Sequence, residues 1–108
     1  MIVPSGPAKR RDKLYIIAEI LEIAKEGTLK TQVMYRANLS FTQLNEYLDR
    51  MLKLRFLENV NVDSRQLYKS TDKGLDFLRR YIEINELLRT EDVYMDVKAP
   101  PPHLLKRT

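Results

Sequence analysis

Residues 40–54 carry the clearest structural signal in this sequence. Ser40 and Gln43 occupy the N-cap and N3 positions of a capping box, in which each side chain accepts a hydrogen bond from the other residue's backbone N–H. The apolar residues that follow recur at spacings of three and one, which places them on one face of a helix: Leu44, Tyr47, Leu48, Met51 and Leu52. The pattern predicts a helix over residues 41–54 with one buried face.

The segment before this helix predicts a shorter one. Thr31 is a candidate N-cap, and the inner face consists of Val33, Met34 and Ala37. Asn38 tolerates the left-handed conformation that ends a helix. Because a turn of only about three residues separates the two helices, they form a helix-turn-helix arrangement.

Another helix is expected at the start of the folded region. Asp12 can cap it, Lys25 lies in its last turn, and Gly27 provides a residue suited to its C-terminal end. Its apolar positions follow the helical period: Ile16, Ile17, Ile20, Leu21, Ile23 and Ala24.

After residue 54 the apolar period changes. A short β-hairpin is predicted around the polar three-residue tip Asp63-Ser64-Arg65, with these apolar residues on either side: Leu57, Val60, Val62, Leu67 and Tyr68. Thr71 then caps a final helix over residues 72–90, in which Gly74 permits close packing against a neighbouring segment.

This order of elements is that of a winged-helix domain, a mainly α fold with a small β-hairpin wing and a long C-terminal helix. We expect residues 1–11 to form a flexible basic arm, residues 12–71 the winged-helix core, residues 72–90 a dimerisation helix and residues 91–108 a Pro-rich tail.

Two stretches of the chain resemble one known family. The stretch from Lys30 to Leu48 resembles the helix-turn-helix of the ArnR-like winged helix-turn-helix family of archaea, which includes the small 10a-type chromatin proteins. The stretch from Leu67 to Leu75 resembles that family's Tyr-x-x-Thr-x-x-Gly entry into the last helix. At Arg55 relatives usually carry Gly, so a different turn into the wing is expected. The resemblance implies binding of double-stranded DNA, often as a homodimer joined through the last helix.

The residues themselves supply candidate DNA contacts. Gln43 and Asn45 have the amide geometry for adenine edges, and Arg50 can pair with guanine or phosphate. The start of the second helix favours an anion through its free N–H groups. The complete candidate set adds the wing and the arm: Lys30, Thr31, Gln32, Tyr35, Arg36, Ser40, Thr42, Gln43, Asn45, Arg50, Lys53, Arg65, Lys69, Arg10 and Arg11.

Two acids on the same helix face oppose phosphate binding. Glu46 and Asp49 are each followed four residues later by a cation, Arg50 and Lys53, and both ion pairs are expected. The alternative is that this face is an ordinary solvated helix surface.

The final helix carries an apolar seam with heptad spacing, made of Phe77, Tyr81, Ile84 and Leu88. One small domain does not cover such a seam completely, so we expect the seam to pair with the same helix of a second chain. The alternative is that the Pro-rich tail folds over it. Asn85 beside the seam is expected to be solvated, with a register-fixing role as the alternative.

Composition excludes several classes of function. The 108-residue chain has no Cys, three Gly and one His, His103, so it offers no thiol nucleophile, Cys-based zinc site, His-based triad or phosphate-cradling Gly-rich loop. Neither an enzyme nor a bound metal or cofactor is expected. With no apolar run near membrane-spanning length and no signal peptide, the prediction is a soluble, cytoplasmic, nucleoid-associated protein.

The net charge of +4 is compatible with a nucleic-acid partner. Most of this excess lies before Leu14, since residues 14–90 carry a net charge of only +1. This modest core charge keeps a second reading open, in which the winged helix docks on another protein. A ligand- or redox-sensing repressor is a weaker third reading, because the chain offers few sensing groups.

Overall fold

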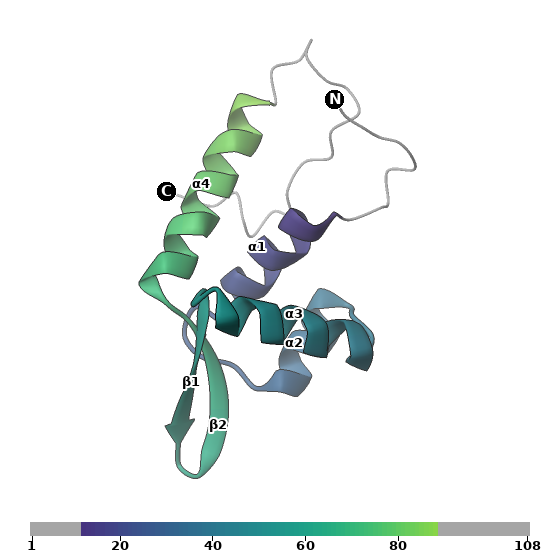
Figure 1. Cartoon of the computed structure of the whole chain (residues 1–108), viewed down its shortest axis with the longest axis vertical. Helices are drawn as coiled ribbons and strands as arrows, with labels where there is room; N and C mark the ends of the chain where they lie inside the picture. Colours follow the sequence, from purple (N-terminus) through teal and green to yellow (C-terminus); the bar gives the residue numbers. More distant parts are fainter. Residues whose placement is uncertain (1–11, 89–108) are drawn as a thin grey trace.

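The computed structural model describes residues 12–88, and the predicted arm and tail lie outside this range. Within it the chain forms α1 (Lys13–Ile23), α2 (Lys30–Ala37), α3 (Phe41–Lys53), β1 (Leu57–Val62), β2 (Arg65–Ser70) and α4 (Asp72–Leu87) (Figure 1). The strands form an antiparallel hairpin. Mainly helical architecture with a hairpin wing confirms the fold class predicted from the sequence.

The helix α1 is the centre of the packing and contacts α2, α4 and β2. Ala18, Ile20 and Leu21 are completely buried, and Asp12 Oδ1 caps the helix by accepting the Tyr15 N–H at 2.8 Å. The predicted end at Gly27 is wrong, since the helix ends at Ile23.

The earlier end of α1 has a structural reason. The chain turns to bring Thr28 beside β2, where its N–H donates to the Tyr68 carbonyl at 2.9 Å and its carbonyl accepts the Tyr68 N–H at 2.8 Å. A helix continued to Gly27 would leave no residues for this turn, in which Gly27 itself adopts a φ of 98°.

Of the three helix ends predicted for the helix-turn-helix, two are confirmed and one is wrong. The capping box of Ser40 and Gln43 is formed, and Asn38 ends α2 in the left-handed conformation. The predicted cap Thr31 instead lies inside α2, because the N-cap is Leu29 and makes no side-chain hydrogen bond. Thr28 is fixed to β2 just before it, so the helix begins as soon as the chain leaves the sheet edge.

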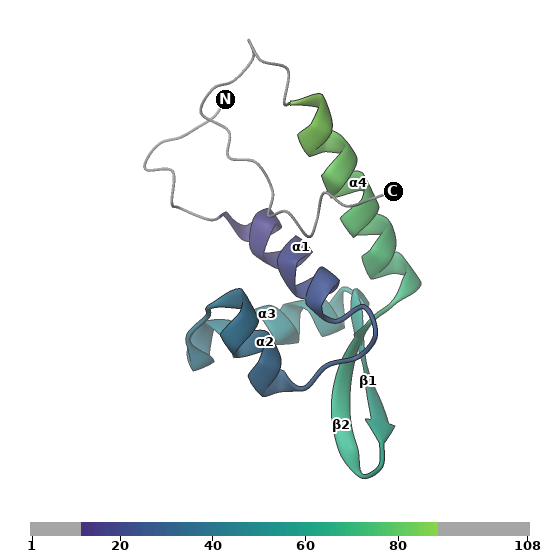
Figure 2. The same ribbon diagram turned by 180° about the vertical axis from the view of Figure 1, so that it is seen from behind.

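The wing is confirmed, with a tighter tip than predicted. Val62 pairs with Arg65, so Arg65 belongs to β2 and the turn consists of Asp63 and Ser64 alone. Both have positive φ, 52° and 66°, as a two-residue type I′ turn requires. The hairpin extends away from the helices, on the opposite side from α4 (Figures 1 and 2).

The start of α4 is locked to the turn after α3. Thr71 caps the helix by accepting the Gly74 N–H at 3.0 Å, while its hydroxyl donates to the Arg55 carbonyl at 2.6 Å. The Thr71 N–H also donates to the Phe56 carbonyl at 2.9 Å. A Cβ on Gly74 would overlap that Phe56 carbonyl oxygen and lie 2.7 Å from Leu21 Cδ2. The predicted close approach at Gly74 is therefore confirmed.

Arg55 adopts the left-handed conformation, φ 67°, that a glycine would occupy at this helix end. The turn into the wing is thus made without glycine. A non-glycine residue in this conformation costs about 1–2 kcal/mol. We expect Arg55→Gly to raise the free energy of unfolding by about 0.5–1 kcal/mol, since the backbone entropy of glycine offsets part of the relief. Denaturant unfolding checks this, and a lower midpoint would contradict it.

Asn85 is buried, so the expected solvated position is wrong. Its Nδ2 donates to the Tyr81 carbonyl at 2.9 Å. Burial raises the pKa of the Tyr81 phenol to about 12, with the side-chain amide of Asn85 opposing the shift and the charges of Asp12 and Tyr15 adding to it. These interactions place Tyr81 beside the start of α1, in contact with its own domain.

The raised pKa of Tyr81 predicts an alkaline loss of stability. Because the neutral phenol is favoured in the folded state, its stabilisation is complete below the unfolded pKa of 10 and is lost as the pH rises from 10 to about 12. We expect the free energy of unfolding of Tyr81→Phe to decrease less steeply than that of the wild type as the pH rises through this range. Denaturant unfolding at pH 9 to 12 measures this, and identical pH slopes for the two proteins would contradict it.

Candidate nucleic-acid interface

The first turn of α2 offers free backbone donors. Among residues 12–88, the N–H groups of Lys30 and Thr31 donate no hydrogen bond, because Leu29 supplies no cap beyond its carbonyl. Thr31 and Gln32 are exposed and Lys30 is half-buried. The positive end of the helix dipole and the positively charged residue Lys30 therefore belong to the same turn, an arrangement that favours an anion.

The second half of α2 adds an exposed aromatic and a cation. Tyr35 is 78% exposed, and Arg36 beside it is also exposed. Both point away from the buried side chains of Val33 and Ala37. Within the described residues Arg36 makes no ion pair, so its guanidinium is available for a partner.

The outward face of α3 is exposed along the whole helix but has no excess of positive charge. Leu44, Leu48 and Met51 are buried, while the opposite face presents these exposed side chains: Thr42, Glu46, Asp49, Arg50 and Lys53. Two acids and two cations balance there. Attraction to a polyanion must therefore come from the residues that flank this face.

The two ion pairs expected on this face are not both formed. Lys53 Nζ lies 3.3 Å from Asp49 Oδ2. No ion pair joins Glu46 to Arg50 in the range 12–88, so that expectation is wrong. Since Arg50 is near the C-terminal end of α3, its free guanidinium is better placed for a phosphate than for the groove floor.

Gln43 and Asn45, the two amide side chains predicted to contact adenine edges, are less available for that role than expected. Gln43 Oε1 accepts the Ser40 N–H at 3.0 Å, and Ser40 Oγ accepts the Gln43 N–H at 3.1 Å. The side chain of Gln43 thus serves the helix cap, and a two-pronged contact with adenine would require the capping box to open. Asn45 is half-buried.

The two cations of the wing lie apart. Arg65 is exposed directly after the tip, whereas Lys69 is at the base of the hairpin opposite Glu58. Four residues of extended strand separate them, about 13 Å. Arg65 is therefore the wing residue that can reach a phosphate beyond α3, although Asp63 in the tip opposes it.

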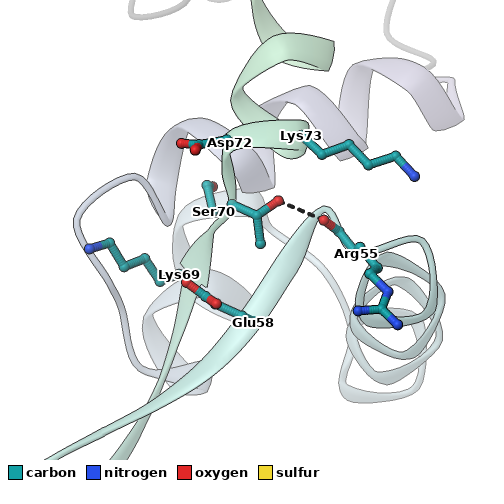
Figure 3. Close-up of a pocket in the computed structure, with 7 residues that line it drawn as sticks. Arg55, Glu58, Lys69, Ser70, Asp72 and Lys73 are labelled. Carbon is teal, nitrogen blue, oxygen red and sulfur yellow. Dashed lines mark hydrogen bonds between the residues drawn. The ribbon is translucent and has the colours of Figure 1, made fainter.

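A hollow at the base of the wing does not make a small-ligand site. It is lined by Arg55, Glu58, Lys69, Ser70, Thr71, Asp72 and Lys73. Figure 3 shows that the charged ends of Arg55, Lys69 and Lys73 point in different directions. They do not converge on a point where one anion could bind.

Three further features describe residues 12–88. These residues contain twelve basic and twelve acidic side chains, so the formal net charge of this range is zero. No three His, Asp or Glu side chains within it form a group that could hold a metal ion. In the same range, no helix is both long and apolar enough to span a bilayer.

Phe41 is a prominent residue of this surface that the sequence analysis missed. It is the first residue of α3 and is 61% exposed, and Lys30 Nζ lies 5.0 Å from the centre of its ring. Phe41 stands three residues before Leu44 and seven before Leu48, a spacing that predicts a buried position. Periodicity therefore gives no signal for it. Only its position as the first residue of α3 gives such a signal.

Comparison with known proteins identifies the relatives of this chain. Residues 10–89 match a family model described as winged helix-turn-helix. An uncharacterized protein of Methanocaldococcus jannaschii is 34% identical over 83 residues, which are 76% of this chain and 37% of that protein. A second uncharacterized protein of the same archaeon is 28% identical over 83 residues, which are 76% of this chain and 81% of that protein. The chain thus spans little more than a third of the first relative.

Solved structures show the same fold. Sso10a-2, a DNA-binding protein from Sulfolobus solfataricus, has a TM-score of 0.63 and 26% identity over 76% of this chain and 90% of its own. ZitR of Lactococcus lactis in complex with DNA has a TM-score of 0.53 and 14% identity over 83% of this chain and 73% of its own. The second likeness concerns the fold alone.

Proposed function

This chain belongs to the winged helix-turn-helix family, and we propose that it binds double-stranded DNA. One observation carries the proposal. The exposed face of α3 carries Arg50, and the neighbouring α2 carries Lys30 and Arg36, three cations without an acidic partner among residues 12–88. Cations free of acidic partners on these two helices match the backbone and groove of a duplex.

The proposed binding mode follows from the elements. The helix α3 enters the major groove with its N-terminal turn nearest the bases, as recognition helices do. The first turn of α2 binds one phosphate through Lys30 and its free N–H groups. Arg36, Arg50 and Arg65 contact phosphates on either side, and the arm residues Arg10 and Arg11 supply further positive charge. The mechanism is binding without a chemical step.

We assign the protein a role as a transcriptional regulator or chromatin-associated factor of the cytoplasmic nucleoid. The DNA-binding protein Sso10a-2, at 26% identity, supports this assignment, as does the archaeal origin of the relatives. Since residues 12–88 have no net charge, affinity for DNA depends on the positions of the cations in this range and on the basic arm.

A homodimer through α4 is part of the proposal. Ile84 and Leu88, the C-terminal half of the predicted seam, are 54% and 41% exposed, and Leu14 on the neighbouring α1 is 52% exposed. Phe77 and Tyr81, the N-terminal half, are half-buried, with Phe77 packed on Phe56 at a ring-centre distance of 5.1 Å. A second chain would therefore bind mainly to the end of α4.

Light scattering tests the dimer. We expect a molar mass of twice the 12.8 kDa chain for the wild type. Replacing Ile84 and Leu88 by lysine is expected to give the monomer mass with unchanged helix content, because both side chains are exposed. A wild-type mass equal to one chain would contradict the dimer and favour coverage of the seam by the chain's own tail.

A second candidate function is docking on another protein, and the balanced charges of the α3 face favour it. A gel shift on random duplex DNA at low salt separates the two. DNA binding predicts a shift at micromolar protein, because phosphate contacts are sequence-independent. The absence of a shift at this concentration would favour the docking module.

A further inference from the structure

We propose that Phe41 recognises thymine methyl groups in the major groove. The inference rests on the proposed DNA binding and adds to it a preference for one chemical feature of the bases. It assigns the role of reading sequence to an apolar ring at the leading end of α3.

The position of the ring is unusual for a phenylalanine. Phe41 is 61% exposed although it belongs to a well-packed helix. Large apolar side chains are ordinarily buried, because exposing them to water is unfavourable. The Lys30 ammonium lies 5.0 Å from the ring centre, so one face of the ring is turned toward a cation. A duplex would meet the cation and the ring together.

The polar groups near Phe41 are already engaged. The Ser40 Oγ and the Gln43 Oε1 both accept backbone N–H groups of the capping box. Of the side chains in the first turn of α3, Phe41 and Thr42 are exposed and take no part in that box. The leading turn therefore offers an aromatic ring, a methyl group and a hydroxyl more readily than a paired donor and acceptor.

Among the base edges in the major groove, thymine alone carries an apolar group, the C5-methyl. A phenylalanine ring at the tip of a recognition helix can cover this methyl and remove both surfaces from water. Wedging of an apolar side chain between base steps is a minor-groove mode, which does not match a ring carried on the helix that enters the major groove. The chemistry thus favours methyl contact.

The test uses two duplexes of one AT-rich sequence, one with thymine and one with every thymine replaced by uracil. This exchange removes only the methyl groups. Fluorescence anisotropy with the full chain is expected to show about four- to fifteenfold tighter binding to the thymine duplex, the effect of burying one or two methyl groups. Phe41→Ala is expected to bind both duplexes with nearly equal affinity. It keeps the fold, because the ring is exposed.

Tyr35→Ala is the matched control, since it also removes an exposed aromatic of the helix-turn-helix. It is expected to keep the wild-type ratio between the two duplexes. Equal wild-type affinities for both duplexes would overturn the role of Phe41 while leaving DNA binding intact. A ratio that survives in Phe41→Ala would also overturn it. Binding to neither duplex would overturn the inference together with the proposed function.

Discussion

Replacing Gly74 by alanine is expected to lower the free energy of unfolding by about 3 kcal/mol, the upper part of the range for overpacking. The added Cβ would overlap the Phe56 carbonyl oxygen and approach Leu21 Cδ2 to 2.7 Å. The first obstacle is backbone, held by the Thr71 N–H at 2.9 Å. It cannot move without separating α4 from the turn after α3.

Denaturant unfolding followed by circular dichroism measures this effect. Glu83→Ala is the matched control, because it introduces the same residue at an exposed site of α4 whose side chain forms no ion pair among residues 12–88. The control is expected to change stability by less than about 0.5 kcal/mol. If Gly74→Ala were as stable as the control, the close approach between α4 and Phe56 would be wrong.

Charge reversal at Arg36 and Arg50 together is expected to weaken duplex binding roughly 100-fold or more at low salt. Charge-assisted hydrogen bonds contribute about 1.5–3 kcal/mol each, and glutamate at these positions adds repulsion from phosphate. Both side chains are exposed and neither forms an ion pair within residues 12–88, so the fold is not expected to change.

The control for this variant carries the same change of charge on another surface. Arg79 and Arg80 are exposed on α4, where both pair with Asp76. Their reversal to glutamate is expected to weaken binding only slightly, through the general loss of positive charge. Equal losses for the two double variants would show that net charge alone, without a defined surface, determines affinity.

Local signals in the sequence predicted the fold well because they act within a few residues. The capping box at Ser40, the caps at Asp12 and Thr71, and the left-handed Asn38 all involve neighbours along the chain. The resemblance to the archaeal winged helix-turn-helix family is confirmed by the family match and by the likeness to Sso10a-2.

Contacts between distant segments explain what the sequence could not predict. The pairing of Thr28 with Tyr68 ends α1 early and makes Leu29 the cap of α2. The contact of α4 with α1 buries Asn85, which no local pattern indicates. The ring of Phe41 is exposed although it has the helical spacing of a buried residue, so periodicity does not indicate its exposure.

The roles of the candidate contacts stay predictions, but the structure changes their order of importance. Lys30, Arg36 and Arg50 become stronger candidates for DNA contacts, because they belong to the helix-turn-helix and have no acidic partners in the described range. Gln43 becomes a weaker candidate for a base contact, since its side chain caps the helix. Lys69 becomes a weaker candidate for a DNA contact, because it lies at the base of the wing.

A salt titration of duplex binding by the full wild-type chain tests the proposed function most directly. If about five cations neutralise phosphates, the logarithm of the binding constant falls with the logarithm of salt concentration at a slope near −4 to −5, about −0.9 per contact. The Arg36 and Arg50 double reversal is expected to reduce the steepness by about two. A wild-type slope near zero, or no binding in dilute salt, would contradict DNA as the partner of this surface.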